Sequence, residues 1–158
     1  MTVQPIPDNY PRLTPYLAVK GAAEAIEFYC DVLGFTRQGD VMVAPDGRIG
    51  HAELQLGESL LMLSDEWPEA DSLSPDTIGG SPVLMNLYVS DVDATYQQAL
   101  EAGATSLAEP EDQFYGDRSA RFVDPWGHRW NIASHVEDVD PEEMERRATA
   151  AMGEVAPE

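Results

Sequence analysis

Two segments of the chain repeat apolar residues at helical spacing, and they predict two similar helices. The first covers residues 21–34 and the second residues 90–103. Gly34 and Gly103 follow the last apolar residues and are typical helix stops. Ser90 and Asp93 are expected to form a capping pair at the second helix. In each segment four apolar residues share one face: Ala22, Ile26, Tyr29 and Leu33, and then Val92, Tyr96, Ala99 and Leu100.

Stretches of alternating apolar and polar residues surround both helices and predict strands. One strand precedes each helix and three follow it, so both halves have the order β-α-β-β-β. The sequence DPWG at 124–127 predicts a turn before the last strand. Residues 66–82 are rich in Pro, Ser, Asp and Gly, which is typical of a linker. The expected strands are 13–19, 37–43, 49–56 and 59–64, and then 83–89, 105–108, 118–124 and 128–134.

The two halves also align with each other, which indicates an internal repeat. Leu17 corresponds to Leu87 and Gly57 to Gly127, an offset of 70 in both cases (87 − 17 and 127 − 57). We therefore expect an α+β fold of two tandem βαβββ modules, 13–65 and 83–135, arranged around a shared cleft. Together they form a single domain over residues 1–139. Residues 140–158 are expected to form an acidic C-terminal helix and tail, with Asp140 as the helix N-cap.

The charge of the chain narrows the range of partners. The 158 residues include 29 Asp and Glu against 9 Lys and Arg, a net charge of −20. Such a chain is a poor partner for nucleic acid or for an anionic membrane. The N-terminus lacks the pattern of a signal peptide, and no apolar run is long enough to span a membrane. The single cysteine, Cys30, is expected to be a buried structural thiol. We expect a cytoplasmic protein.

Strand alternation predicts which side chains enter the cleft, because each helix covers only one face of its sheet. His51 and Glu53 are close enough on one strand to move a proton together, or they form a polar pair hydrogen-bonded to Arg121. Tyr16 and Tyr88 could hold a planar ligand between them. The side chains expected in the cleft are Tyr16, His51, Glu53, Gln55, Asn86, Tyr88, Ser119, Arg121, Arg129 and Asn131.

Two further pairs of charged residues have expected roles. Arg121 and Arg129 are the inward cations, and they either orient a carboxylate or carbonyl of a ligand or compensate for acidic neighbours. Asp117 and Arg118 lie in the segment EDQFYGDRS, and we expect them to form an ion pair with each other. Trp130 is expected on the helix side of its strand, in the core.

Four segments resemble the vicinal oxygen chelate superfamily, which includes glyoxalase I, bleomycin-resistance proteins and extradiol dioxygenases. The segments are YLAVKGAAEAIEFYCDVLGF, GHAELQLGESLLMLSDE, LYVSDVDATYQQALEAGA and YGDRSARFVDPWGHRWNIASHVEDV, within residues 13–139. The pattern YGDR…DPWGHRW is most similar to the glyoxalase-like, PhnB-like branch. The resemblance implies paired βαβββ modules and a homodimer.

The resemblance also implies a divalent metal held by His and Glu on the first and last strand of each module. Carried over to this chain, the metal positions hold Thr14, Leu61, Leu84 and Asn131. None of these is a strong ligand for a divalent ion, so we expect neither this metal nor another cofactor. A displaced site would need His51 and Glu53 together with His128 or His135.

Two functions remain open. In the first, the chain is a metal-independent binding protein of the glyoxalase/bleomycin-resistance type that holds a small organic molecule in its cleft. In the second, it is a glyoxalase-type lyase or isomerase in which His51 and Glu53 transfer a proton. Whether the chain is an enzyme therefore stays open at this stage.

Overall fold

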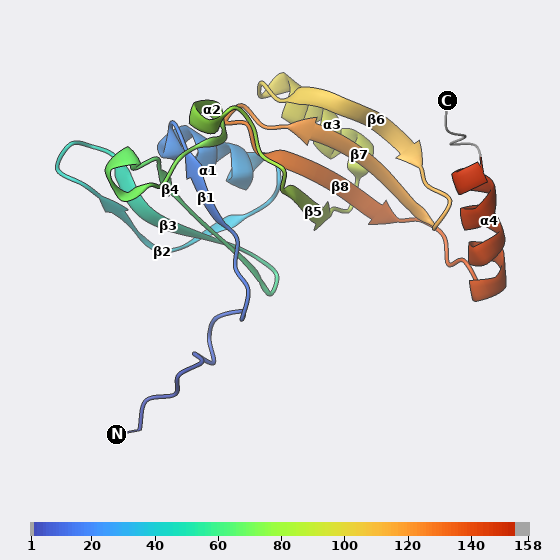
Figure 1. Ribbon diagram of the computed structural model, residues 1–158, viewed down its shortest axis with the longest axis horizontal. Helices are drawn as coiled ribbons and strands as arrows, with labels where there is room; N and C mark the ends of the chain where they lie inside the picture. The colour runs from blue at the N-terminus through green and yellow to red at the C-terminus, as the bar shows by residue number, and fades with distance from the viewer. Residues whose placement is uncertain (1, 154–158) are drawn as a thin grey trace. The chain divides into compact units, whose positions relative to one another are not determined.

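The computed structural model describes residues 2–153 and divides into two units, Met1–Ser81 and Pro82–Glu158 (Figure 1). Each unit contains one four-stranded sheet. The boundary between them falls at the end of the linker that the sequence predicts. None of the helices within residues 2–153 is long and apolar enough to cross a membrane.

The first unit has the predicted order of one strand, one helix and three strands. It consists of β1 (Tyr16–Val19), α1 (Ala22–Asp31), β2 (Thr36–Val43), β3 (Ile49–Leu56) and β4 (Ser59–Asp65), followed by η1 (Pro68–Ala70) and α2 (Pro75–Ile78). The sheet has the order β1-β4-β3-β2. Its first pair, β1 with β4, is parallel, and the other pairs are antiparallel.

The second unit repeats this topology. It consists of β5 (Leu84–Tyr88), α3 (Val92–Glu101), β6 (Thr105–Asp112), β7 (Asp117–Val123), β8 (Arg129–His135) and α4 (Pro141–Gly153). The sheet order is β5-β8-β7-β6, again with one parallel pair, β5 with β8. The α+β class and the tandem βαβββ architecture are therefore confirmed.

Each helix packs its apolar face on one side of its own sheet. In the first unit Ile26 and Tyr29 of α1 are buried with Leu54 and Leu63 of the sheet. In the second unit α3 lies behind β7 and β8 in Figure 1, and Tyr96 is buried with Phe122, Trp130 and Ile132. We call the opposite side of each sheet its open face. Burial of these large apolar side chains is the main force that holds each helix to its sheet.

The two helices begin in different ways. Gly21, at the N-cap of α1, has a φ of 108° and no side chain to cap the helix. Instead, Oδ1 of Asp65 on β4 accepts hydrogen bonds from the backbone N–H groups of Gly21 (3.0 Å) and Ala22 (2.9 Å). At α3 the N-cap is Asp91, whose side chain accepts from Ala94 N at 3.0 Å. The expected capping pair of Ser90 and Asp93 is therefore wrong.

The register of the strands corrects the expected constant offset of 70. Tyr16 pairs with Met62 and Asn86 pairs with Asn131, so the last strands align at 131 − 62 = 69. Glu53 and Arg121, which pair with these two residues, align at 121 − 53 = 68. The offset changes because the hairpin loops of the two units differ in length. The two helices keep the offset of 70 (92 − 22 and 101 − 31).

The segment between the units is more structured than the predicted linker, since η1 and α2 lie within it. Glu66 accepts hydrogen bonds from both the backbone N–H (2.9 Å) and the hydroxyl (2.6 Å) of Ser74, the N-cap of α2. A further bond comes from Thr77. These hydroxyl and N–H donors, Ser74 first, lower the pKa of Glu66 to about 2.

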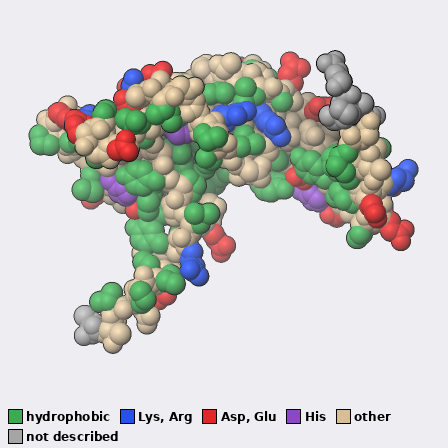
Figure 2. Space-filling model, viewed as in Figure 1, with side chains coloured by type: hydrophobic (Ala, Val, Ile, Leu, Met, Phe, Trp, Pro, Cys, Tyr) green, Lys and Arg blue, Asp and Glu red, His purple; other side chains and the backbone are tan. Residues whose placement is uncertain are grey.

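The predicted C-terminal helix is confirmed as α4. The side chain of Asp140 accepts from Glu143 N at 3.0 Å, and Glu142 and Glu143 occupy the first turn, where acids are favourable. The predicted tail, residues 154–158, lies outside the described residues. On the face seen in Figure 2, acidic side chains are scattered over the surface, with some on α4. The division into a single domain, 1–139, and a tail stays a prediction.

Candidate functional site

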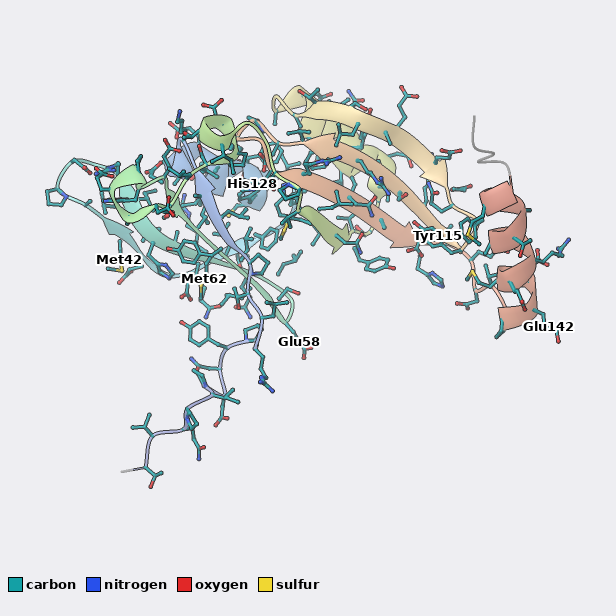
Figure 3. All side chains as sticks on the ribbon, in the orientation of Figure 1. Met42, Glu58, Met62, Tyr115, His128 and Glu142 are labelled. Carbon is teal, nitrogen blue, oxygen red and sulfur yellow. The ribbon has the colours of Figure 1, made fainter. Side chains whose placement is uncertain are left out.

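The open face of the first sheet carries the predicted pair His51 and Glu53, both on β3. The register sets Met42 opposite His51, and it sets Met62 beside both Tyr16 and Glu53. Figure 3 labels the two methionines on this side of the sheet. The face therefore combines an imidazole and a carboxylate with a phenol and two thioether side chains.

The imidazole of His51 is bonded at both nitrogens. Nε2 lies 3.0 Å from Oε1 of Glu53, and Nδ1 lies 2.9 Å from the hydroxyl of Tyr16. A carboxylate can only accept, so Nε2 carries the hydrogen and Nδ1 of the neutral ring is the acceptor. The side chain of His51 is 29% exposed and that of Glu53 is 14% exposed. The ring is held in one tautomer and remains accessible, as an acid–base group requires.

Glu53 has a second partner that the sequence analysis missed. The hydroxyl of Tyr10, in the segment before β1, lies 3.1 Å from both oxygens of the Glu53 carboxylate. This hydrogen bond raises the pKa of Tyr10, because ionisation would leave two anions in contact. Nothing in the sequence pattern marks Tyr10, since it lies outside any periodic segment. The expected partner of Glu53, Arg121, donates within its own unit to Asn131.

On the second sheet, three predicted residues form a short polar chain on the open face. Nδ2 of Asn131 donates to Oδ1 of Asn86 at 2.6 Å, and Nε of Arg121 donates to Oδ1 of Asn131 at 3.3 Å. Asn131 is buried, whereas the Arg121 side chain is exposed. The amide pair therefore fixes the position of the guanidinium group, which keeps donors available to a ligand.

A second cluster on this sheet is centred on Asp117. Its Oδ2 accepts from the hydroxyl of Tyr88 at 2.7 Å, and its Oδ1 lies 2.9 Å from Nδ1 of His135. The other ring nitrogen of His135 lies 2.8 Å from Asp138. Hydrogen bonds to Asp138 and then Asp117 raise the pKa of His135. The bonds from His135 and Tyr88 lower the pKa of Asp117, and the bond to Asp117 raises the pKa of Tyr88.

This cluster corrects the expected pairing of Asp117 with Arg118. The two residues are neighbours on β7, so their side chains point to opposite sides of the sheet. Arg118 instead bonds Asp93 of α3 (2.7 Å) and Asp112 of β6 (3.0 Å). The sequence did contain a signal for Asp117, because it precedes Ser119 and Arg121 by two and four positions. Extending the predicted strand one residue back, from 118 to 117, would have set it on the open face.

The remaining predicted residues lie where alternation sets them. Ser119 and Arg129 lie on the open face of the second sheet, as β-strand alternation from Arg121 and Asn131 requires. Gln55, on the first sheet, donates to the carbonyl oxygen of Gly57 at 3.1 Å.

Trp130 is 1% exposed, in the core as expected. Cys30 was expected to be buried, but the structure leaves it half-buried at the end of the apolar face of α1. Its partial burial raises the pKa of the thiol.

The positions carried over from the family's metal site do not fit a divalent ion. Leu61 is 2% exposed on the helix side of β4, so the open-face counterpart of Asn131 is Met62, and the prediction for Leu61 is wrong. Thr14 lies before β1, and Leu84 begins β5. Threonine, methionine, leucine and asparagine form a weak donor set for a hard or borderline ion. Across residues 2–153, no group of three or more His, Cys, Asp or Glu side chains could hold a metal ion.

The fold and these open faces define a class of protein, and sequence comparison agrees with it. Residues 11–132 match the sequence profile of the Glyoxalase/Bleomycin resistance protein/Dioxygenase superfamily. The match covers most of the chain, and the chain belongs to this superfamily. The family expected from the sequence is thereby confirmed.

Similar proteins are found in several bacteria. Uncharacterized protein Rv0887c of Mycobacterium tuberculosis is 41% identical over 138 residues, which cover 85% of this chain and 81% of the relative. Among solved structures, TioX from Micromonospora sp. ML1 has a TM-score of 0.60 at 26% identity, over 80% of this chain and 99% of TioX. Protein PA1353 from Pseudomonas aeruginosa has a TM-score of 0.62 at 23% identity, with the same coverage. These likenesses support the fold.

Proposed function

We propose that the chain binds a small organic molecule on its open sheet faces and needs no metal to do so. The observation that carries the proposal is the anchoring of two exposed tyrosines. Tyr16 is 50% exposed and Tyr88 is 60% exposed, yet their hydroxyls are bonded to His51 and Asp117. Anchored rings lose little further freedom when a planar ligand stacks on them, and this lowers the entropy cost of binding.

The polar residues on the same faces suggest the chemistry of the ligand. Arg121 offers guanidinium N–H groups, and the side chain of Gln55 is exposed. The carboxylate of Glu53 is already hydrogen-bonded by Tyr10 and His51. With each face taken by itself, a planar molecule with a carbonyl oxygen fits the donors of the second sheet, and a neutral planar molecule fits the first sheet. The weak donor set at the carried-over metal positions supports binding without an ion.

Ligand screening by thermal shift tests the proposal. Neutral planar aromatic molecules are expected to raise the melting temperature, because they bind only the folded chain. Tyr16→Leu should weaken a hit that binds the first sheet by up to about tenfold, and Tyr88→Leu should do the same to a hit that binds the second sheet, because each change removes one aromatic contact. Ile78→Ala, at an exposed position on α2, is the matched control and should leave affinity unchanged. The proposal is wrong if no molecule binds while a divalent metal stabilises the chain at stoichiometric concentration.

A second candidate function is proton transfer of the lyase or isomerase type, and the 3.0 Å contact between His51 and Glu53 supports it. Hits from the screen can be incubated in D₂O and followed by proton NMR for loss of a C–H signal. His51→Ala should abolish this exchange while the chain remains folded. Unchanged exchange would exclude His51 from the role.

A homodimer and a cytoplasmic location stay predictions.

A further inference from the structure

The hydrogen bonds around His51 point to one atom as the place where a ligand would exchange a proton. We propose that the hydroxyl oxygen of Tyr16 is this atom, with His51 taking up the phenolic proton, and that the ligand group it meets is a hydroxyl. The inference goes beyond ligand binding.

The direction of the Tyr16 hydrogen bond follows from the geometry. The Tyr16 hydroxyl has one hydrogen and two nearby acceptors, Nδ1 of His51 at 2.9 Å and the carbonyl oxygen of Gly50 at 3.4 Å. The shorter contact is the better hydrogen bond. Because Nε2 of His51 donates to Glu53, Nδ1 is free to accept the phenolic hydrogen. The lone pairs of the Tyr16 oxygen then remain for a donor on the ligand, and a hydroxyl is such a donor.

Glu53 and Tyr10, at the far end of this series of hydrogen bonds, are arranged to stabilise a positive charge on His51. When the imidazole takes a proton it becomes a cation, and the carboxylate of Glu53 lies 3.0 Å from its other nitrogen. Tyr10 donates to both oxygens of that carboxylate and limits its rotation. This is the arrangement of a nucleophile, a base and an orienting acid, with tyrosine as the first member. Tyr16 is the catalytic residue, and His51 and Glu53 are positioning residues that act through it.

The proposed step balances without any co-reactant. The O–H bond of the ligand breaks as its proton bonds to the Tyr16 oxygen, while the original phenolic proton moves to Nδ1 of His51. The ligand is left as an oxyanion and His51 as an imidazolium held by Glu53. The reverse transfer restores the starting state after the ligand has reacted.

Tyr88 offers a comparison within the same chain. It has similar exposure, but its hydroxyl donates to the carboxylate of Asp117, which is held in turn by His135. A carboxylate is far too weak a base to remove a phenolic proton, whereas a neutral imidazole is a stronger one. The negative charge beside Tyr88 also raises its pKa. Tyr88 is therefore an exposed tyrosine without an activating base.

Modification by phenylmethanesulfonyl fluoride tests the inference on the full chain without a known ligand. The Tyr16 oxygen forms a bond to sulfur, fluoride leaves, and the phenolic proton passes to His51. We expect Tyr16 to be modified at least about tenfold faster than Tyr88, a modest effect for a positioned base. Peptide mass spectrometry measures both rates in one sample. The Tyr88 rate also reports whether each variant remains folded.

His51→Ala and His51→Gln should both remove the advantage of Tyr16 while leaving the Tyr88 rate unchanged. Added imidazole should restore the advantage in His51→Ala by occupying the vacated space, which a purely structural role would not allow. The inference is overturned if Tyr16 reacts no faster than Tyr88, if the advantage survives in both His51 variants, or if imidazole restores nothing. Binding of planar molecules is independent of these results, so the proposed function can stand if this inference fails.

Discussion

The hydroxyl of Tyr10 contacts both carboxylate oxygens of Glu53 at 3.1 Å, and this contact ties the segment before β1 to the middle of β3. Tyr10→Phe removes the contact and keeps the ring. We expect the segment to detach more often, so that trypsin cleaves the bond between Arg12 and Leu13 faster than in the unchanged chain. Timed digestion followed by mass spectrometry measures the rate. An unchanged rate would show that the contact does not hold the segment.

Asp65 should be more important for stability than an ordinary helix cap. Besides Gly21 and Ala22, it accepts a hydrogen bond from Ile49 N at 2.7 Å, so it joins β4 to both α1 and β3. We expect Asp65→Ala to lower the free energy of unfolding by about 2–4 kcal/mol, since three backbone donors lose a charged acceptor. Asp91→Ala, which removes the local cap of α3, should cost about 1 kcal/mol.

Urea unfolding of the two variants measures this difference. Equal losses would show that Asp65 acts as a simple cap and does not join the three elements.

Gly116 stands where a side chain cannot be accommodated. A Cβ atom there would lie 2.2 Å from the carbonyl oxygen of Glu137, and the φ of 98° is itself unfavourable for other residues. Gly47 has a similar φ of 88° with no atom close to its added Cβ. We expect Gly47→Ala to cost about 1–2 kcal/mol from backbone strain alone. Gly116→Ala should cost clearly more in the same unfolding measurement, and equal costs would contradict the contact with residue 137.

The stabilisation that His135 provides should depend on pH. Its pKa is raised above 6.5 by Asp138 and Asp117, and Tyr88 is the other titratable group at Asp117. A raised pKa in the folded chain means that the stabilisation is fully present below the unfolded value and is lost as pH rises through the folded value. The melting temperature of the unchanged chain should therefore exceed that of His135→Asn most at about pH 6.

The difference in melting temperature between the unchanged chain and His135→Asn should narrow toward about pH 9. Added salt should reduce this difference further, because His135 is exposed. A difference in melting temperature that is constant over this pH range would show that the imidazole contributes no charge-dependent stabilisation.

Strand alternation and helix spacing were sufficient to predict the fold, because both modules bury a regular apolar face. They also set His51, Glu53, Asn86 and Asn131 on the open faces correctly. The errors arose where tertiary structure decides between local alternatives. Hairpin loops of different length shifted the alignment, and Leu61 was assigned a position that Met62 holds.

Contacts between distant segments account for the other misses. Asp65 reaches α1 across 44 positions and Tyr10 reaches Glu53 across 43, and no local pattern encodes either contact. Asp117 was missed for a different reason. The predicted strand begins at residue 118, one residue too late, so the alternation that sets Asp117 on the open face with Tyr88 and His135 was not applied to it.

Methyl NMR of the methionines tests most directly whether the open face of the first sheet binds a ligand. Met42 and Met62 lie on this face (Figure 3). Met144 and Met152 belong to α4. Titration with the strongest planar aromatic hit should shift the signals of Met62 and Met42 in a saturable way and leave those of Met144 and Met152 in place. Saturable shifts confined to Met144 and Met152 would contradict the proposed site.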